Sequence, residues 1–267
     1  MIDPTTILAG WEPGTGEATI RTEEGKQMSI PWMLAITLAI LQLSVFCTTI
    51  YLHRAKTHRG LELHPAVGLL MHLELSLFTG MVPREWAAVH RKHHHFSDVE
   101  GDPHSPYIYG LWTVLFGNYF LYRRVTKDAA VVRKYTPDWK NDALDGLPLM
   151  NYAALGGIAI FMLMFGVWWG LAAWAVHAVL YVLLNSSVNS VCHWVGYRNF
   201  ANKATNLQSI ALMTAGEGLH NNHHQFPTSA RFAWRRGEFD PAWPLIRALE
   251  SLRLARVKPL PAEKMAA

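Results

Sequence analysis

The chain has 267 residues, of which 51% are hydrophobic and only 16% are charged. Soluble proteins carry about 25% charged residues, so this composition favours one membrane-embedded domain over a soluble one. A formal net charge of +4 without a clustered basic stripe argues against a nucleic-acid partner, and two cysteines without a CxxC spacing argue against a disulfide framework.

The N-terminal residues 1–29 are polar, do not resemble a signal peptide and predict a flexible arm. Three apolar stretches approach the roughly 20 residues that a helix needs to cross a bilayer. They cover residues 30–52, 152–169 and 171–190. We therefore predict an all-α integral membrane protein, a small bundle of about three to four spans. Residues 53–150 and 193–267 would form a cytosolic helical cap, within a single domain 1–267.

A fourth apolar stretch, residues 65–82, contains His72 and Glu74 and lies between two histidine clusters. If it crossed, those clusters would be separated by roughly 30 Å of hydrocarbon. We expect instead a buried re-entrant or interfacial helix packed against the bundle. Residues 109–122 are apolar but short, and they predict an interfacial helix on the cytoplasmic leaflet.

The distribution of positive charge predicts the orientation. Of the 24 lysines and arginines, three lie in residues 51–64, nine in residues 83–150 and ten after His193. With three spans and an external N-terminus, these 22 share one side, which the positive-inside rule assigns to the cytoplasm. All the histidine clusters lie in these same segments.

Nine of the fourteen histidines recur in short clusters: His53 and His58, His90, His93 and His94, His193, and His220, His223 and His224. Residues three and four apart share one face of a helix, so each trio is expected to aim its imidazoles at one locus. His53 and His58 are five apart and do not share a face of a straight helix. Either the helix ends or bends there, or the two serve different metals.

Nine imidazoles are too many for one ion and suit two ions of iron, zinc, copper or nickel. Asn189 lies four residues before His193 and could complete a shell directly or through water. Asp98, Asp102 and Glu217 are expected to accept hydrogen bonds from imidazole N–H groups, with a helix cap or a solvated charge as the alternative for Asp98. His72 and His177 are interpreted as core residues, and His64 and His104 as contacts of the ligands or as surface residues. His95 extends one trio and could replace His93 or His94 in a shifted pattern. Cys192 breaks the all-histidine pattern.

Around these residues the chain closely resembles the membrane fatty acid desaturases of the stearoyl-CoA type and their bacterial acyl-CoA and acyl-lipid relatives. The matching segments are HRAKTHRG, EWAAVHRKHHHFSDVEGDPHSP, NSVCHWVGYR and GEGLHNNHHQFP. They extend from about Tyr51 to Pro227. The eight-histidine pattern alone is shared with membrane alkane hydroxylases, fatty acid hydroxylases and alkene-forming decarboxylases.

The resemblance implies a di-iron centre held by the nine histidines, with Asn189 reaching one iron through water and O2 as co-substrate. It places Trp86 at the bend of a substrate tunnel. Family members commonly have a second span before the first histidine cluster; here lipid, oligomer contacts or residues 65–82 would replace it. Asn185 stands where the family has a threonine. We expect Thr37 and Leu41 in the first span to set tunnel depth.

The polar run 185–190 should face the site, and Gly156, Gly157 and Gly166 should permit close helix contact.

The implied reaction inserts a cis double bond into a saturated acyl chain linked to CoA, a lipid or a carrier protein. Because the chain contains no haem, iron–sulfur or Rossmann motif, electrons would come from a ferredoxin, rubredoxin or cytochrome with its reductase. The expected location is the bacterial inner membrane, with a homo-oligomer possible. The rival functions are a di-iron hydroxylase or decarboxylase and a non-catalytic membrane metal carrier.

Overall fold

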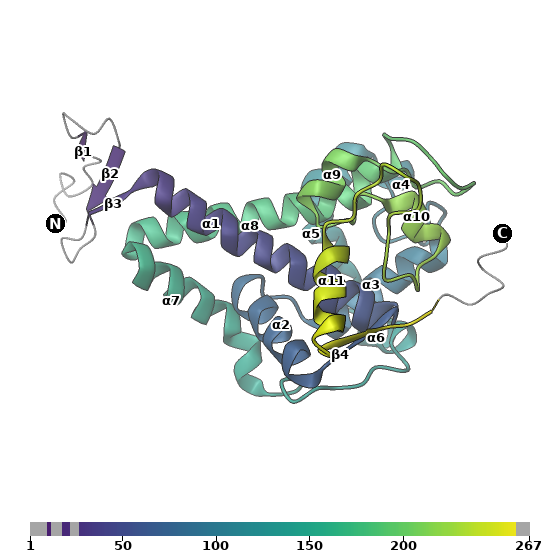
Figure 1. Ribbon diagram of the computed structural model, residues 1–267, viewed down its shortest axis with the longest axis horizontal. Helices are drawn as coiled ribbons and strands as arrows, with labels where there is room; N and C mark the ends of the chain where they lie inside the picture. The colour runs from purple at the N-terminus through teal and green to yellow at the C-terminus, as the bar shows by residue number, and fades with distance from the viewer. Residues whose placement is uncertain (1–9, 12–17, 22–26, 260–267) are drawn as a thin grey trace.

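The computed structural model describes residues 10–11, 18–21 and 27–259, and three long helical runs form its framework (Figure 1). The first is α1 (Ile30–Cys47), which continues as the π-helix η2 (Thr48–Thr57). The second joins η3 (Pro148–Tyr152) to α7 (Ala153–Phe165), and the third joins α8 (Val167–Ser190) to η4 (Val191–His193). All three runs are long and apolar enough to cross a membrane.

The outer surfaces of these helices fit a lipid environment. Large apolar side chains are exposed along them, among them Leu34, Leu38, Leu155, Leu163 and Trp168. A water-soluble monomer rarely exposes so continuous an apolar surface. Together with the length of the helical runs, this supports a membrane protein.

The boundary between the second and third spans lies earlier in the chain than predicted. The second span ends at Phe165 and not at residue 169, and the third begins at Val167 and not at residue 171. The boundary is Gly166, whose φ of 81° lies in the left-handed region and ends α7 at Phe165. Trp169 therefore belongs to α8, and Gly166 forms a one-residue turn, not a close helix contact. Gly157 does make the expected contact, because an added Cβ would overlap the carbonyl oxygen of Leu77 in the neighbouring helix.

Residues 65–82 turn back without crossing. They form α2 (Pro65–Phe78), which is followed by α3 (Pro83–Phe96) at an angle of 91°. The Nε2 atoms of His58 and His90, on either side of this segment, lie 2.9 Å apart. Both ends of the segment therefore lie at the same end of the helical bundle, as its length and its flanking histidines predicted.

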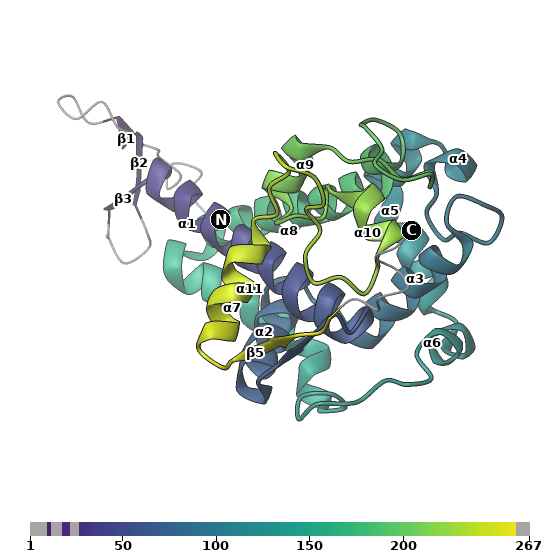
Figure 2. The ribbon, with the colours of Figure 1, turned by 45° about the vertical axis from the view of Figure 1, so that its right-hand side comes forward.

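The remaining helices surround the histidine-bearing end of the bundle (Figure 2). They are α4 (Pro106–Tyr109), α5 (Leu111–Thr126), α6 (Ala129–Tyr135), α9 (Gln208–Met213), α10 (His220–Gln225) and α11 (Ala242–Ser251). The predicted single helix over residues 109–122 is wrong at its start, because Gly110 has a φ of 84° and separates α4 from α5. Trp112, Phe116 and Phe120 on α5 are exposed, as an interfacial helix requires.

Two contacts between distant segments hold the end of the first span. Strand β4 (Leu61–Leu63) pairs antiparallel with β5 (Ala255–Val257). The buried Arg54 guanidinium donates to both carboxylate oxygens of Asp240, each at 3.0 Å. A bidentate, charge-assisted pair of this kind fixes orientation as well as distance, and it lies next to His53.

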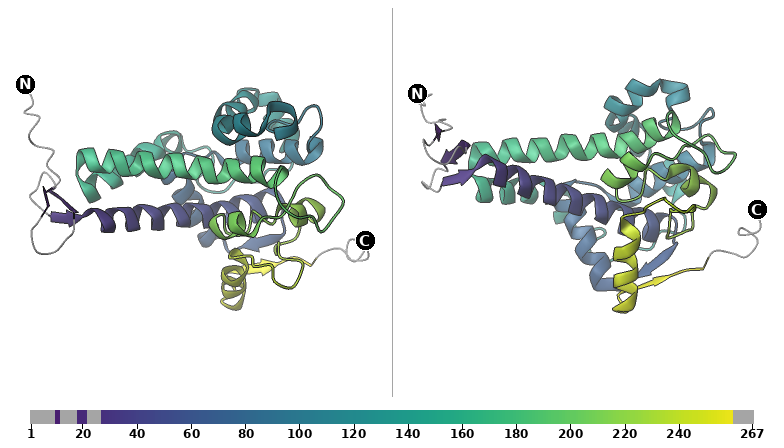
Figure 3. Two further views of the ribbon diagram at one scale, coloured as in Figure 1. Left: turned by 90° about the horizontal axis from the view of Figure 1, so that it is seen from above. Right: turned by 45° about the horizontal axis from the view of Figure 1, so that its top comes forward.

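Short strands occupy part of the predicted N-terminal arm. Strands β1 (Gly10–Trp11), β2 (Ala18–Arg21) and β3 (Gln27–Ser29) form a three-stranded antiparallel sheet before α1. The rest of the arm, residues 1–9, 12–17 and 22–26, lies outside the described residues. Figure 3 shows this sheet at the end of the molecule opposite α10.

Candidate metal centre

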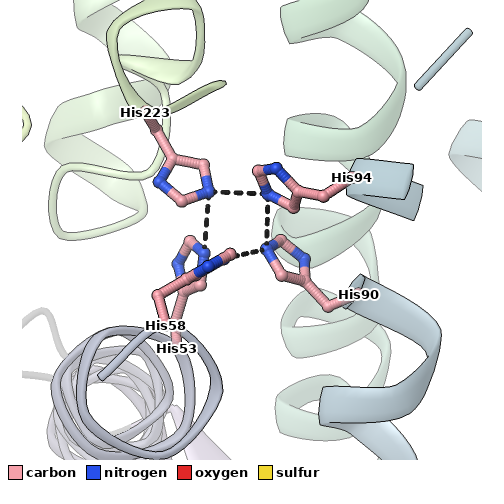
Figure 4. Close-up of side chains that lie close together, drawn as sticks. All are labelled: His53, His58, His90, His94 and His223. Carbon is pink, nitrogen blue, oxygen red and sulfur yellow. Dashed lines mark hydrogen bonds between the residues drawn. The ribbon is translucent and has the colours of Figure 1, made fainter. Parts of the chain in front are cut away.

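The nine predicted histidines meet in two adjacent clusters. His53, His58, His90, His94 and His223 form the five-histidine cluster (Figure 4). His93, His193, His220 and His224 form the four-histidine cluster. Within each cluster the ligand atoms all lie within 4.8 Å of one another. The first span, α3, the end of α8 and α10 contribute these side chains, so the centre exists only where four segments meet.

Each trio is divided between the two clusters, so the expectation of one locus per trio is wrong. His90 and His94 face His223, whereas His93 lies 3.2 Å from His224 across the neighbouring cluster, Nε2 to Nε2. The cause is helical geometry, because positions i and i+4 lie about 40° apart around the axis while i+3 lies about 60° to the other side. The helices α3 and α10 therefore each contribute histidines to both clusters.

The π-helix explains how His53 and His58 enter the same cluster. The backbone N–H of His58 donates to the carbonyl of His53 at 3.0 Å, which closes an i to i+5 turn. This wider turn places residues five apart on one face. The helix end that the sequence allowed for is found at Thr57, just before His58, and the wider turn brings both histidines into the five-histidine cluster.

Three carboxylates contact the outer nitrogens of three histidines. Glu217 Oε2 lies 2.6 Å from Nδ1 of His53. Asp98 Oδ2 lies 2.6 Å from Nδ1 of His193, and Asp102 Oδ2 lies 2.9 Å from Nδ1 of His93. An ionised carboxylate can only accept, so each fixes the proton on Nδ1 and turns the lone pair of Nε2 inward.

The electrostatics agree with this arrangement. Burial acts to raise the pKa of Glu217, but the charge of His53 and its hydrogen bond outweigh it and lower that pKa. The pKa of Asp102 is lowered in the same way, with His93 opposing burial. Burial and then neighbouring imidazoles hold the pKa values of His220, His223 and His224 well below 6.5. The carboxylates are therefore ionised and these imidazoles neutral near pH 7.

The donor set fits a pair of transition-metal ions. Neighbouring Nε2 atoms of the five-histidine cluster lie 2.9–3.0 Å apart. Two nitrogens that bind one ion at about 2.1 Å and at a right angle are separated by about 3.0 Å. The buried Nε2 of His193 has no hydrogen-bond partner among the described residues. Each neutral imidazole can offer a lone pair from one ring nitrogen, so nitrogens this close together can converge on one cation.

The other histidines remain outside both clusters. His104 is buried beside His93 and Asp102, and burial followed by the charge of His93 lowers its pKa to about 3. His95 is exposed, and the side chain of His64 accepts from the backbone of Ala66. His72 Nδ1 lies 2.9 Å from a carboxylate oxygen of Asp142, and His177 is buried near Ser44. Cys192 is buried and lies outside both clusters.

A cavity of about 330 Å³ adjoins the clusters. His90, His220 and Asn189 line it at the histidine end, as do Trp86 and Asn185. Trp86 stacks on His90, with ring centroids 4.8 Å apart and planes 13° apart. The cavity extends along one face of α8 from Asn189 to Trp174, a helical distance of about 22 Å. Its shape suits an elongated apolar ligand.

Thr37 and Leu41 do not line this cavity. The hydroxyl of Thr37 donates to the carbonyl of Met33, and Leu41 packs into the core with Val45 and Tyr181. The first span instead contributes Thr48, within the π-helix. The cavity is lined mainly along α8, and Thr37 and Leu41 are buried outside its lining.

The sequence analysis missed several residues that line the cavity: Trp174, Ala178, Tyr181, Val182, Asn118 and Tyr122. The first three are spaced four and three apart on α8, in register with Asn185 and Asn189. That spacing was a usable signal, because it marks one helix face that leads to the histidine end.

Comparisons with known proteins agree with this geometry. The model of the family "Fatty acid desaturase" matches residues 29–251. An acyl-CoA 5-desaturase from Anemone leveillei is 34% identical over 237 residues, 82% of this chain and 69% of that protein. An icosanoyl-CoA 5-desaturase from Limnanthes douglasii is 33% identical over 241 residues, 87% of this chain and 66% of that protein.

A relative named for a lipid-linked substrate is also similar to this chain. The sn-1 stearoyl-lipid 9-desaturase from Anabaena variabilis is 31% identical over 212 residues, 78% of this chain and 76% of that protein. The family match covers most of the chain and includes all nine clustered histidines, α8 and the cavity. The chain therefore belongs to the fatty acid desaturase family.

Proposed function

We propose that this protein is an O2-dependent fatty acyl desaturase that inserts a cis double bond into a saturated chain with two iron ions as its cofactor. The observation that carries this proposal is the cavity along α8, which ends at both histidine clusters. The overall reaction converts –CH2–CH2–, O2, two electrons and two protons into –CH=CH– and two waters. Its balance requires an external electron donor.

The nine histidines would hold the two ions, one in each cluster, with Asn189 contributing through a water. The iron ions would supply the oxidation–reduction chemistry with O2, for which imidazole ligands are suited. The protein's own part is to position the ligands. Glu217, Asp98 and Asp102 keep the protons of His53, His193 and His93 on Nδ1, so that Nε2 faces inward.

The cavity residues would orient the acyl chain and exclude water. Trp86, stacked on His90, forms a rigid wall next to the five-histidine cluster. Asn185 donates its amide N–H to the carbonyl of Tyr181, and this hydrogen bond fixes the side chain where it lines the cavity. Holding one C–C bond beside the metal site replaces a diffusional encounter with a fixed geometry.

We propose an acyl-CoA as substrate, with lipid-linked and carrier-protein-linked chains as the alternatives that a test must separate. The two plant relatives bear acyl-CoA and icosanoyl-CoA names, whereas the cyanobacterial relative is named for a lipid-linked chain. We further propose a single catalytic domain in a bacterial inner membrane with the histidine end in the cytoplasm. The distribution of lysine and arginine supports that orientation.

The test is product analysis with the purified protein, iron, O2 and a chemical or protein reductant. Stearoyl-CoA, a stearoyl lipid and a stearoyl carrier protein are supplied in parallel, and double bonds are mapped by mass spectrometry. An internal cis alkene from one of them supports the proposal. An alcohol or a terminal alkene without an internal alkene would show a hydroxylase or a decarboxylase instead.

A further inference from the structure

A surface beside α10 combines exposed aromatic and arginine side chains. We define the α10 surface as Trp194, Tyr197, Arg198, Trp234, Arg235 and Arg236. The three aromatic side chains are 43–51% exposed, and the three arginines are exposed. Trp, Tyr and Arg are the residue types most enriched in the energetic centres of protein interfaces.

The two loops that carry this surface are joined into one unit. Tyr197 OH donates to Glu238 at 2.8 Å, and the Asn199 amide donates to the same carboxylate oxygen at 2.6 Å. The backbone N–H groups of Trp234 and Arg235 donate to the other oxygen of Glu238. The carboxylate is thus enclosed by donors, and the surface is presented as a fixed shape.

The charge of this surface is unbalanced. Arg198 donates to the backbone carbonyls of Lys203 and Ala204. Within the described part of the chain, Arg198, Arg235 and Arg236 form no ion pair with a carboxylate. A rigid basic patch of this kind raises the encounter rate with acidic proteins.

Lipid does not account for the patch. α10 lies at the end of the molecule farthest from the β1–β3 sheet, beyond the histidine-bearing ends of α1 and α8 (Figure 1). The spans run away from this end, and Trp234, Arg235 and Arg236 belong to none of them. These three side chains are therefore placed to meet a soluble partner.

The surface is connected to the histidines by aromatic contacts. Trp234 stacks on Phe226 with ring centroids 4.6 Å apart, and Phe226 immediately follows α10, which carries three of the histidines. Two residues before Trp234, Phe232 lies 4.8 Å from the ring of His223 and 5.6 Å from the ring of His53. The five-histidine cluster is thus in contact with Phe232, two residues along the chain from the exposed indole.

We propose that the α10 surface is the docking site for a small acidic protein that carries one electron at a time. This inference rests on the proposed function, because the desaturation consumes two electrons. In each encounter the carrier would lose one electron to the metal site. Two encounters would therefore supply the two electrons needed for each double bond. Trp234 and Phe226 lie between the docked carrier and α10.

The test measures binding and reduction separately, with the full chain in nanodiscs and an acidic [2Fe–2S] ferredoxin as the probe. Arg235→Glu combined with Arg236→Glu is expected to weaken ferredoxin binding about tenfold or more at low salt. Binding of the unaltered chain should weaken as salt rises. The matched control, Arg133→Glu with Lys134→Glu on α6, reverses the same number of exposed charges on another element and should leave binding unchanged.

Single-turnover experiments distinguish this inference from the proposed function. Enzyme reduced by dithionite and then mixed with O2 should form the same alkene in the unaltered chain and in the Arg235/Arg236 variant. The ferredoxin-driven rate should fall in the Arg235/Arg236 variant but not in the Arg133/Lys134 control. Trp234→Leu should also lower this rate. Absence of alkene from the dithionite-reduced unaltered chain would refute the proposed function. Alkene formation together with unaffected or absent ferredoxin binding would refute the docking site alone.

Discussion

Glu217 and His53, which come from opposite ends of the chain, lie 2.6 Å apart at the end of the first span. Glu217 also accepts a hydrogen bond from the hydroxyl of Thr49, one helical turn before His53. The carboxylate therefore joins the loop before α10 to the π-helix. Through this contact, the protonation and the orientation of a first-span histidine depend on a residue of the C-terminal cap.

Replacing Glu217 by Gln should weaken metal binding without unfolding the protein. The amide keeps the size of the side chain but loses the charge that holds the His53 proton on Nδ1. Loss of such an outer partner typically lowers metal affinity about 10–100-fold. Iron retention during titration with a chelator measures the metal affinity. Glu62→Gln, a substitution at an exposed carboxylate, is the control. Equal retention in both variants would contradict the assigned role.

Alanine substitutions should distinguish the two clusters by their metal content. His220→Ala leaves three imidazoles in the four-histidine cluster, whereas His58→Ala leaves four in the other. Because four protein ligands make a closed site and three leave it open, His220→Ala should lose more metal. Elemental analysis of purified protein checks this, and His95→Ala, outside both clusters, should retain the full content. The reverse order would show that the clusters do not act as separate sites.

The contact between α2 and α7 should depend on the absence of a side chain at Gly157. An added Cβ would overlap the carbonyl oxygen of Leu77, which cannot move without shifting α2. Overpacking of this kind costs about 1–3 kcal/mol. Gly157→Ala should therefore lower the thermal unfolding temperature in detergent. Gly117→Ala, with only ordinary contacts and an ordinary φ, should not lower it. Equal unfolding temperatures would refute the close packing.

The far end of the cavity should limit the length of the acyl chain. Trp174 lines the cavity at the end remote from the histidines, and its indole N–H has no partner among the described residues. Trp174→Ala opens space for further methylenes, each worth about 0.8 kcal/mol when buried, or about fourfold in preference. Competition between acyl chains of different length measures the shift toward longer substrates. Trp168→Ala, on the lipid-exposed surface, should leave the preference unchanged.

Some of the site could be read from local spacing alone. Repeated i, i+3 and i+4 histidines predicted which side chains meet at the end of the bundle, because helical periodicity is a short-range property. The positions of Asp98, Asp102 and Glu217, which flank the histidine clusters in the sequence, predicted their contacts with the imidazoles. The prediction failed for Thr37 and Leu41, because which face of a helix borders a cavity depends on how neighbouring helices pack.

The sequence by itself determined the helical class, the three apolar spans and the requirement that residues 65–82 turn back. These follow from hydropathy, chain length and the shared side of the histidines. Only the tertiary structure decided which histidines belong together. Each trio is split because a helix between two clusters presents i and i+4 to one and i+3 to the other. His53 and His58 join one cluster because the backbone winds as a π-helix, and packing against α3 and the C-terminal cap accompanies that conformation.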